Sequence, residues 1–137
     1  MNPQPKIFIF DKKTDDRFLL VHFLRYFSFN VEVINDIEDF SHQITRYQPD
    51  LLILSDTLSP SDGCQICEVL AKRAENDTVY IVMLVEETLA RHKNKIHGVA
   101  VDMVVSRPRI TDKDYSYFKI AEFVHQHLIN KYSGNKN

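Results

Sequence analysis

Five short stretches of this chain are rich in apolar residues, and polar or turn-forming residues flank each of them. The stretch Leu51–Leu54 is unbroken by polar residues, which is typical of a strand buried on both faces of a parallel sheet. The expected strands cover residues 6–10, 31–34, 51–54, 79–85 and 101–105.

Between and after these runs the apolar residues recur at intervals of three and four, the spacing of one helical face. We expect a third helix that starts near Gly63 and a weak fourth helix over residues 88–97, which Gly98 ends. The clear helices bury Leu20, Phe23, Leu24 and Phe27; Ile37, Phe40, Ile44 and Tyr47; Cys67, Leu70, Ala71 and Ala74; and Tyr117, Ile120, Ala121, Val124 and Leu128.

Strands that alternate with helices predict a parallel sheet covered on both faces. For five such units we expect an α/β, flavodoxin-like (βα)5 fold, doubly wound, with a five-stranded parallel sheet in the order 2-1-3-4-5. Its strand ends should bring Asp11, Asp56, Val85 and Arg107 together. The length predicts one domain over residues 1–137, with a core at about 6–128 and a polar tail at 129–137.

Composition narrows the class of protein. The net charge of −2 provides no basic field for nucleic acid. No apolar run approaches the length of a membrane span, and the polar N-terminus lacks the apolar core of a signal peptide. We therefore expect a cytoplasmic protein that binds neither nucleic acid nor membrane.

The most informative stretch is PDLLILSDTLSPSDG at residues 49–63. Its apolar run ends in Ser55 and Asp56, and a loop with Pro60 and an Asp-Gly pair follows. Together with the pair Arg107-Pro108 after the fifth strand, it resembles the CheY-like receiver domain of bacterial two-component response regulators. The resemblance covers about residues 6–128, implies that Asp56 stands at the phosphoacceptor position, and implies a cis peptide bond before Pro108.

Residues around Asp56 depart from the pattern of working receivers. Such receivers carry two adjacent carboxylates after strand one to hold magnesium, and the second is Lys12 here. Such receivers end strand four with Ser or Thr, and this chain has Val85 there. Their lysine after strand five is Arg107 here, a change that is not conservative. The resemblance thus marks a pocket of Asp11, Lys12, Val85, Glu86 and Arg107, with Val104 at the aromatic switch position.

Magnesium requires oxygen ligands, and an ammonium group at a ligand position repels it. We therefore expect a pseudo-receiver that signals by protein–protein interaction, without efficient magnesium-dependent phosphorylation, cofactor, bound metal or enzymatic activity. Lys12 or Arg107 should pair with Asp56 in place of the metal, and Glu86 with the other cation.

Two alternatives remain open. A functional single-domain response regulator would accept a phosphoryl group on Asp56 in a phosphorelay. A small thiol-redox protein would use Cys64 and Cys67, which have the C-x-x-C spacing.

Partners follow from the resemblance. It implies a protein partner, either a histidine kinase or a downstream effector, that docks on helix 4, strand 5 and helix 5, and it also allows a homodimer through that face. Arg91, Lys93 and Lys95 form a basic cluster there. A solvated helix face would show the same pattern of charges.

Overall fold

The computed structural model describes residues 4–12, 14–72, 79–86, 95–96, 98–108 and 113–133. Its main sheet has five parallel strands in the order β2-β1-β3-β4-β7. These strands are β1 (Lys6–Phe10), β2 (Asn30–Val33), β3 (Leu51–Ser55), β4 (Tyr80–Val85) and β7 (Met103–Ser106). Because β7 is the fifth strand of this sheet along the chain, the predicted order and the flavodoxin-like fold class are confirmed.

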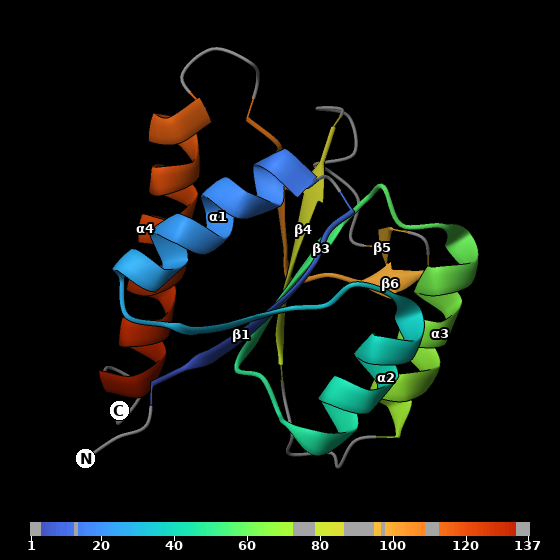
Figure 1. Ribbon diagram of the computed structural model, residues 1–137. Coiled ribbons are helices and arrows are strands. Elements are labelled where there is room, and N and C mark those ends of the chain that lie inside the picture. Colours follow the sequence, from blue (N-terminus) through green and yellow to red (C-terminus); the bar gives the residue numbers. More distant parts are fainter. Residues whose placement is uncertain are drawn as a thin grey trace.

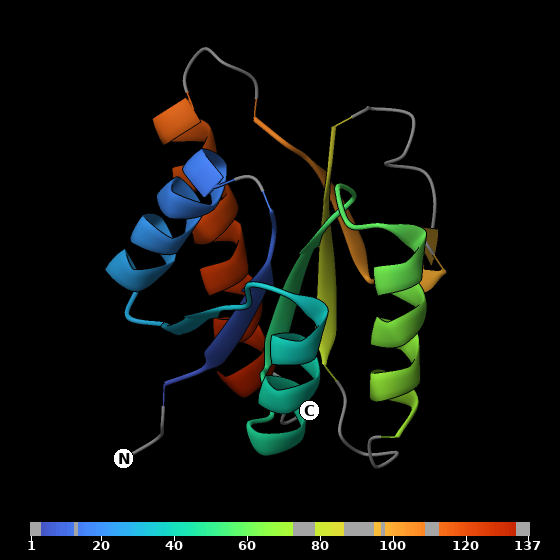
Figure 2. The same cartoon turned by 45° about the vertical axis from the view of Figure 1, so that its right-hand side comes forward.

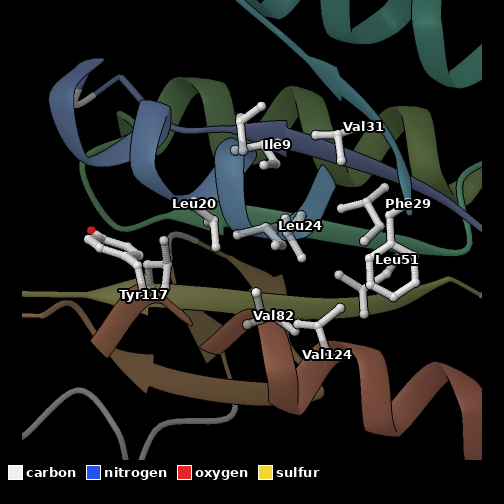
Figure 3. Close-up of a cluster of buried hydrophobic side chains, with 14 of the residues drawn as sticks. Ile9, Leu20, Leu24, Phe29, Val31, Leu51, Val82, Tyr117 and Val124 are labelled. Atoms are coloured by element: carbon white, nitrogen blue, oxygen red, sulfur yellow. The ribbon is translucent and has the colours of Figure 1, made fainter. Parts of the chain in front are cut away.

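Helices cover both faces of the sheet (Figures 1 and 2). Helices α1 (Thr14–Tyr26) and α4 (Lys113–Ser133) lie on one face, and α2 (Ile37–Arg46) and α3 (Pro60–Ala71) lie on the other. Successive side chains of a strand point to opposite faces. Strand β1 therefore gives Ile9 to the core beneath α1 and α4, shown in Figure 3, and Phe10 to the core beneath α2 and α3.

The helix starts have local causes in the sequence. Asp36 caps α2 by accepting a hydrogen bond from the backbone N–H of Asp39 at 2.7 Å. Ser59 caps α3 in the same way, and Pro60 occupies the first helical position, where its missing N–H costs nothing. The expected start near Gly63 was therefore three residues too late, and Gly63 and Ile66 are the buried residues of α3.

Most of the predicted apolar stripes face the core, with differences at helix ends. Leu20, Leu24, Phe40, Ile44 and the stripe of α4 are buried or packed against the core clusters. Tyr47 follows the last residue of α2 and is 40% exposed, and Ala71 at the end of α3 is exposed as well. Ala74 lies outside the described residues.

The region predicted as a fourth helix contains a small hairpin instead. Strand β5 (Lys95–Ile96) pairs antiparallel with β6 (Val99–Ala100), so the prediction is wrong at this end. Residues 88–94 and 97 lie outside the described part of the chain. Gly98 has a φ of 83°, which suits the tight turn of a hairpin. The peptide bond before Pro108 is trans, so the expected cis bond is also wrong.

Candidate functional site

The carboxyl ends of the central strands meet at one edge of the sheet, where open α/β folds place their functional groups. Asp11 follows β1, Asp56 follows β3, and Arg107 follows β7. The backbone N–H of Arg107 donates to the carbonyl of Val85 at 2.7 Å, which holds the start of the loop beside the end of β4. The topology of the sheet therefore brings Asp11, Asp56 and Arg107 to the same edge, as the sequence predicts.

The side chain of Arg107 is the centre of this site. Its Nη1 and Nη2 atoms lie 2.9 Å and 3.0 Å from the two carboxylate oxygens of Asp11, a bidentate pair. Nη2 also donates to Ser55 Oγ at 2.7 Å, and Nε lies 3.4 Å from Glu86 Oε1. The side chains of Arg107 and Asp11 are 2% and 0% exposed, so this ion pair is buried.

A second carboxylate joins the same guanidinium to two helices. Asp16 on α1 lies 3.4 Å from Arg107 Nη1 and accepts hydrogen bonds from Tyr117 at 2.8 Å and Lys113 at 2.9 Å, both on α4. Arg107 also donates to the hydroxyl of Tyr117 at 3.3 Å. The network therefore connects the sheet edge to α1 and α4.

Sequence reasoning missed the members of this network on the helices. Asp16 was not identified from the sequence as a site residue, yet its side chain is only 3% exposed. Tyr117 was placed correctly in the core but only as an apolar residue. A buried tyrosine usually finds a partner for its hydroxyl, and that rule was the available signal.

The network shifts the pKa values of its members. Burial alone would raise the pKa of Asp16, but the hydrogen bonds and charges of Lys113, Tyr117 and Arg107 outweigh it and bring that pKa below 3.8. Burial likewise opposes the charge on Arg107, and contact with Asp11 nevertheless raises its pKa. Burial and the hydrogen bond to Asp16 raise the pKa of Tyr117. At neutral pH the carboxylate of Asp16 and the guanidinium are charged, and Tyr117 is neutral.

Asp56 lies at the end of β3 and is partly exposed. Its backbone N–H donates to the carbonyl of Leu84 at 2.9 Å, and its Oδ2 accepts from the backbone N–H of Glu86 at 3.0 Å. The turns after β3 and β4 are thereby tied together.

The expected partners of Asp56 pair with other carboxylates. Arg107 forms its ion pairs with Asp11, Asp16 and Glu86. Lys12 is 51% exposed and lies 3.3 Å from Asp62 on α3. The prediction that one of these two cations pairs with Asp56 is therefore wrong, whereas Glu86 does pair with one of them.

The remaining candidates lie apart from this network. Val85 is fully buried at the end of β4, and Val104 packs against the core beneath α2 and α3. Cys64 on α3 is exposed, and the thiol of Cys67 donates to the carbonyl of Gly98 at 3.2 Å, which ties α3 to the hairpin. In the basic cluster, Arg91 and Lys93 fall outside the described residues, and Lys95 belongs to β5.

Magnesium does not fit the donor set of this pocket. Both oxygens of Asp11 already accept hydrogen bonds from a buried guanidinium, and Lys12 supplies a cation where a second carboxylate is needed. Among the described residues, no group of three or more His, Cys, Asp or Glu side chains is placed to hold a metal ion. Nor do the described helices include one long and apolar enough to cross a membrane.

No protein-family model and no curated protein matches this chain. Solved structures do match. A response regulator from Hahella chejuensis is 18% identical with a TM-score of 0.68, and the match covers 88% of this chain and 94% of that one. The chemotaxis response regulator CheY4 of Vibrio cholerae is 16% identical with a TM-score of 0.65, and the match covers 87% of this chain and 99% of that one.

A third match comes from a complex. The receiver domain of the Saccharomyces cerevisiae response regulator Ssk1, crystallised with the histidine phosphotransfer protein Ypd1, is 16% identical with a TM-score of 0.60; the match covers 79% of this chain and 81% of that one. All three are described as response regulators or their receiver domains, which are signalling proteins. The chain therefore has the CheY-like receiver fold.

Removal of the central cation tests the network. Arg107→Met leaves the carboxylate of Asp11 buried without the guanidinium, and we expect the free energy of unfolding to fall by about 3–5 kcal/mol. Lys12→Met is the matched control, because it removes an exposed ion pair that contributes at most about 1 kcal/mol. Chemical denaturation at neutral pH measures both. Equal losses in the two variants would contradict a central role for Arg107.

The lowered pKa of Asp16 predicts a dependence of stability on pH. As the pH falls, the unfolded chain takes up a proton on this residue before the folded chain does, so protonation favours unfolding. The stability that ionised Asp16 provides is present above about pH 3.8 and is lost as the pH falls further through the folded pKa. Denaturation of the wild type and of Asp16→Asn between pH 7 and pH 3 should show their difference shrinking in acid. A constant difference would show that the ionised form of Asp16 has no special role.

Proposed function

We propose that this chain is an atypical receiver-like domain of a two-component or phosphorelay system. It acts by binding another protein and is not efficiently phosphorylated on Asp56 in a magnesium-dependent reaction. The main support for the proposal is the buried guanidinium of Arg107, which donates hydrogen bonds to both carboxylate oxygens of Asp11.

Phosphoryl transfer to a carboxylate depends on positive charge placed where negative charge develops, and on positioning of the reacting groups. Here the single positive charge of Arg107 is shared among ion pairs with Asp11, Asp16 and Glu86. A divalent ion at Asp11 would displace the guanidinium and leave it buried away from its carboxylates. Breaking a buried ion pair in this way is strongly unfavourable.

The neighbours of Asp56 support the same conclusion. Val85, at the end of β4, has no hydroxyl to contact a phosphoryl group and is fully buried. Glu86 carries a negative charge beside Asp56, and its backbone N–H already donates to Asp56 Oδ2. An incoming phosphoryl group would meet repulsion in addition to the missing metal.

The pocket in this proposal stays in one state, either constitutively active or constitutively inactive. A side-chain cation does not leave when the magnesium concentration falls, and Arg107 is tied through Asp16 to Tyr117 and Lys113 on α4. Signalling would then depend on the amount of the protein and on what it binds.

The partner in this proposal is a protein, with a histidine kinase, a phosphotransfer protein or a downstream effector as the candidates. The matched receiver of Ssk1 was crystallised with a histidine phosphotransfer protein, which supports a protein partner for this fold. We propose the cytoplasm as the compartment and a single domain as the unit that binds.

The rival function is that of a phosphate acceptor. One observation favours it: Asp56 keeps the position at the end of β3 and its side chain is partly exposed. A phosphodonor could therefore reach it, and the choice between the two functions depends on the response to magnesium.

The test compares the wild type with the triple variant Lys12→Asp, Val85→Thr and Arg107→Lys, which restores the pattern of a working receiver. In the wild type we expect no saturable amide shifts at Asp11 and Asp56 with millimolar magnesium, with or without the phosphate analogue beryllofluoride. The triple variant should gain such shifts, because it regains a second carboxylate and loses the guanidinium from Asp11.

A phosphodonor assay gives the independent result. Incubation with acetyl phosphate and magnesium should leave the mass of the wild type unchanged. A gain of one phosphoryl group in the wild type that disappears in Asp56→Asn would overturn the proposal and establish the rival.

A further inference from the structure

Strand β7 is an edge strand of the main sheet, with β4 on its inner side. The backbone N–H of Asp102 donates to the carbonyl of Ile81, so the backbone groups of Asp102 face β4. Backbone direction alternates along a strand, which turns the N–H and C=O groups of Met103 and Val105 outward. No strand within the described residues pairs with this outer side.

Among the described residues, this edge lacks the features that usually protect one. Natural sheets guard their edges with lysine, proline, bulges or a covering segment, because unpaired backbone groups invite another strand. The sequence of β7 is Met-Val-Val-Ser, without a charge or a proline, and the first proline is Pro108, two residues beyond its end. The edge is thus chemically open to strand pairing.

An apolar groove of about 430 Å³ runs beside this edge, between β7 and α4. Val105, Ile120 and Phe123 contribute to its walls, and Phe123 is 44% exposed. Ser106 also lines it, and the buried Oγ of Ser106 has no hydrogen-bond partner in the described structure. Lys119 also lines the groove. The groove therefore offers mainly apolar surface, with one hydroxyl and one lysine, next to a row of backbone donors and acceptors.

We propose that an extended segment of a partner protein adds as a sixth strand to the outer edge of β7. Its backbone pairs with the N–H and C=O groups of Met103 and Val105, and its alternate apolar side chains enter the groove. A helical segment has its own backbone groups already bonded and cannot satisfy this edge.

A second copy of the chain fits this groove poorly. In a pairing of β7 with β7, the Met103 and Val105 side chains of the second copy would be the ones available to fill the groove. Both already pack against the core beneath their own α1 and α4. An extended segment with free apolar side chains has no such constraint.

The inference rests on the proposed function only in naming the kind of partner that the signalling domain binds. Pairing at β7 does not require any particular charge state at Arg107. A negative result in the binding experiment below would therefore overturn only the pairing at β7. A positive result in the magnesium titration would overturn only the proposed function.

The probe is a short blocked peptide of alternating valine and threonine with a lysine at each end. Added to the labelled full chain, it should cause saturable amide shifts at Met103 and Val105 and slow the hydrogen exchange of these two amides. The amide of Val104 already faces β4 and should keep its exchange rate. Absence of saturable shifts at Met103 and Val105 would overturn the proposal.

Backbone methylation of the peptide supplies the matched control. N-methyl groups on the amides that face β7 should weaken binding roughly tenfold, since each removes a hydrogen bond and adds a clash. N-methyl groups on the intervening amides should have little effect. Equal affinities for the two methylated peptides would exclude strand pairing.

Side-chain variants test the groove. Phe123→Ala should weaken binding severalfold, while Phe18→Ala, which removes a 72% exposed ring on α1, should not. Equal effects of the two variants would exclude the groove. Slowed exchange at Met103 and Val105 that grows with protein concentration in the absence of peptide would assign the edge to a second copy and overturn the proposal.

Discussion

The buried ion pair between Arg107 and Asp11 is the interaction on which the rest of the site depends. Removing two charges from water costs several kcal/mol per ion, and the attraction between them compensates only when the remaining donors and acceptors are also bonded. Ser55 and Asp16 accept from the guanidinium, and Tyr117 in turn donates to Asp16. These polar residues lie in an otherwise apolar interior because the guanidinium requires them there.

Under the proposed function, the same ion pair restricts how the domain can change state. A switch needs two conformations of similar free energy and a ligand that prefers one of them. A metal ion binds or dissociates as its concentration changes. The cation of Arg107 is covalently part of the chain and donates two hydrogen bonds to Asp11. In that proposal, differential binding of a partner is the means by which one state could be selected over another.

The sequence carried enough information for the sheet but not for the pairing of charges within the site. Short apolar stretches specified the strands, and topology then required Asp11, Asp56 and Arg107 to meet. A long, flexible arginine can reach several carboxylates, and its choice of Asp11 over Asp56 depends on burial that sequence spacing does not reveal. The two-residue strands β5 and β6 were missed because they are too short to show a periodic pattern.

Strand β7 belongs both to the open edge of the sheet and to the polar network. The backbone N–H and C=O groups of Met103 and Val105 face the outer edge. Arg107 follows the strand directly, and its N–H donates to the carbonyl of Val85. A strand that pairs with β7 would fix the backbone that positions the guanidinium, so the two sites share one structural element. Such coupling is reciprocal in free energy. Any rearrangement at Arg107 that displaces β7 would therefore change affinity at the edge by the same factor by which edge binding changes the rearrangement.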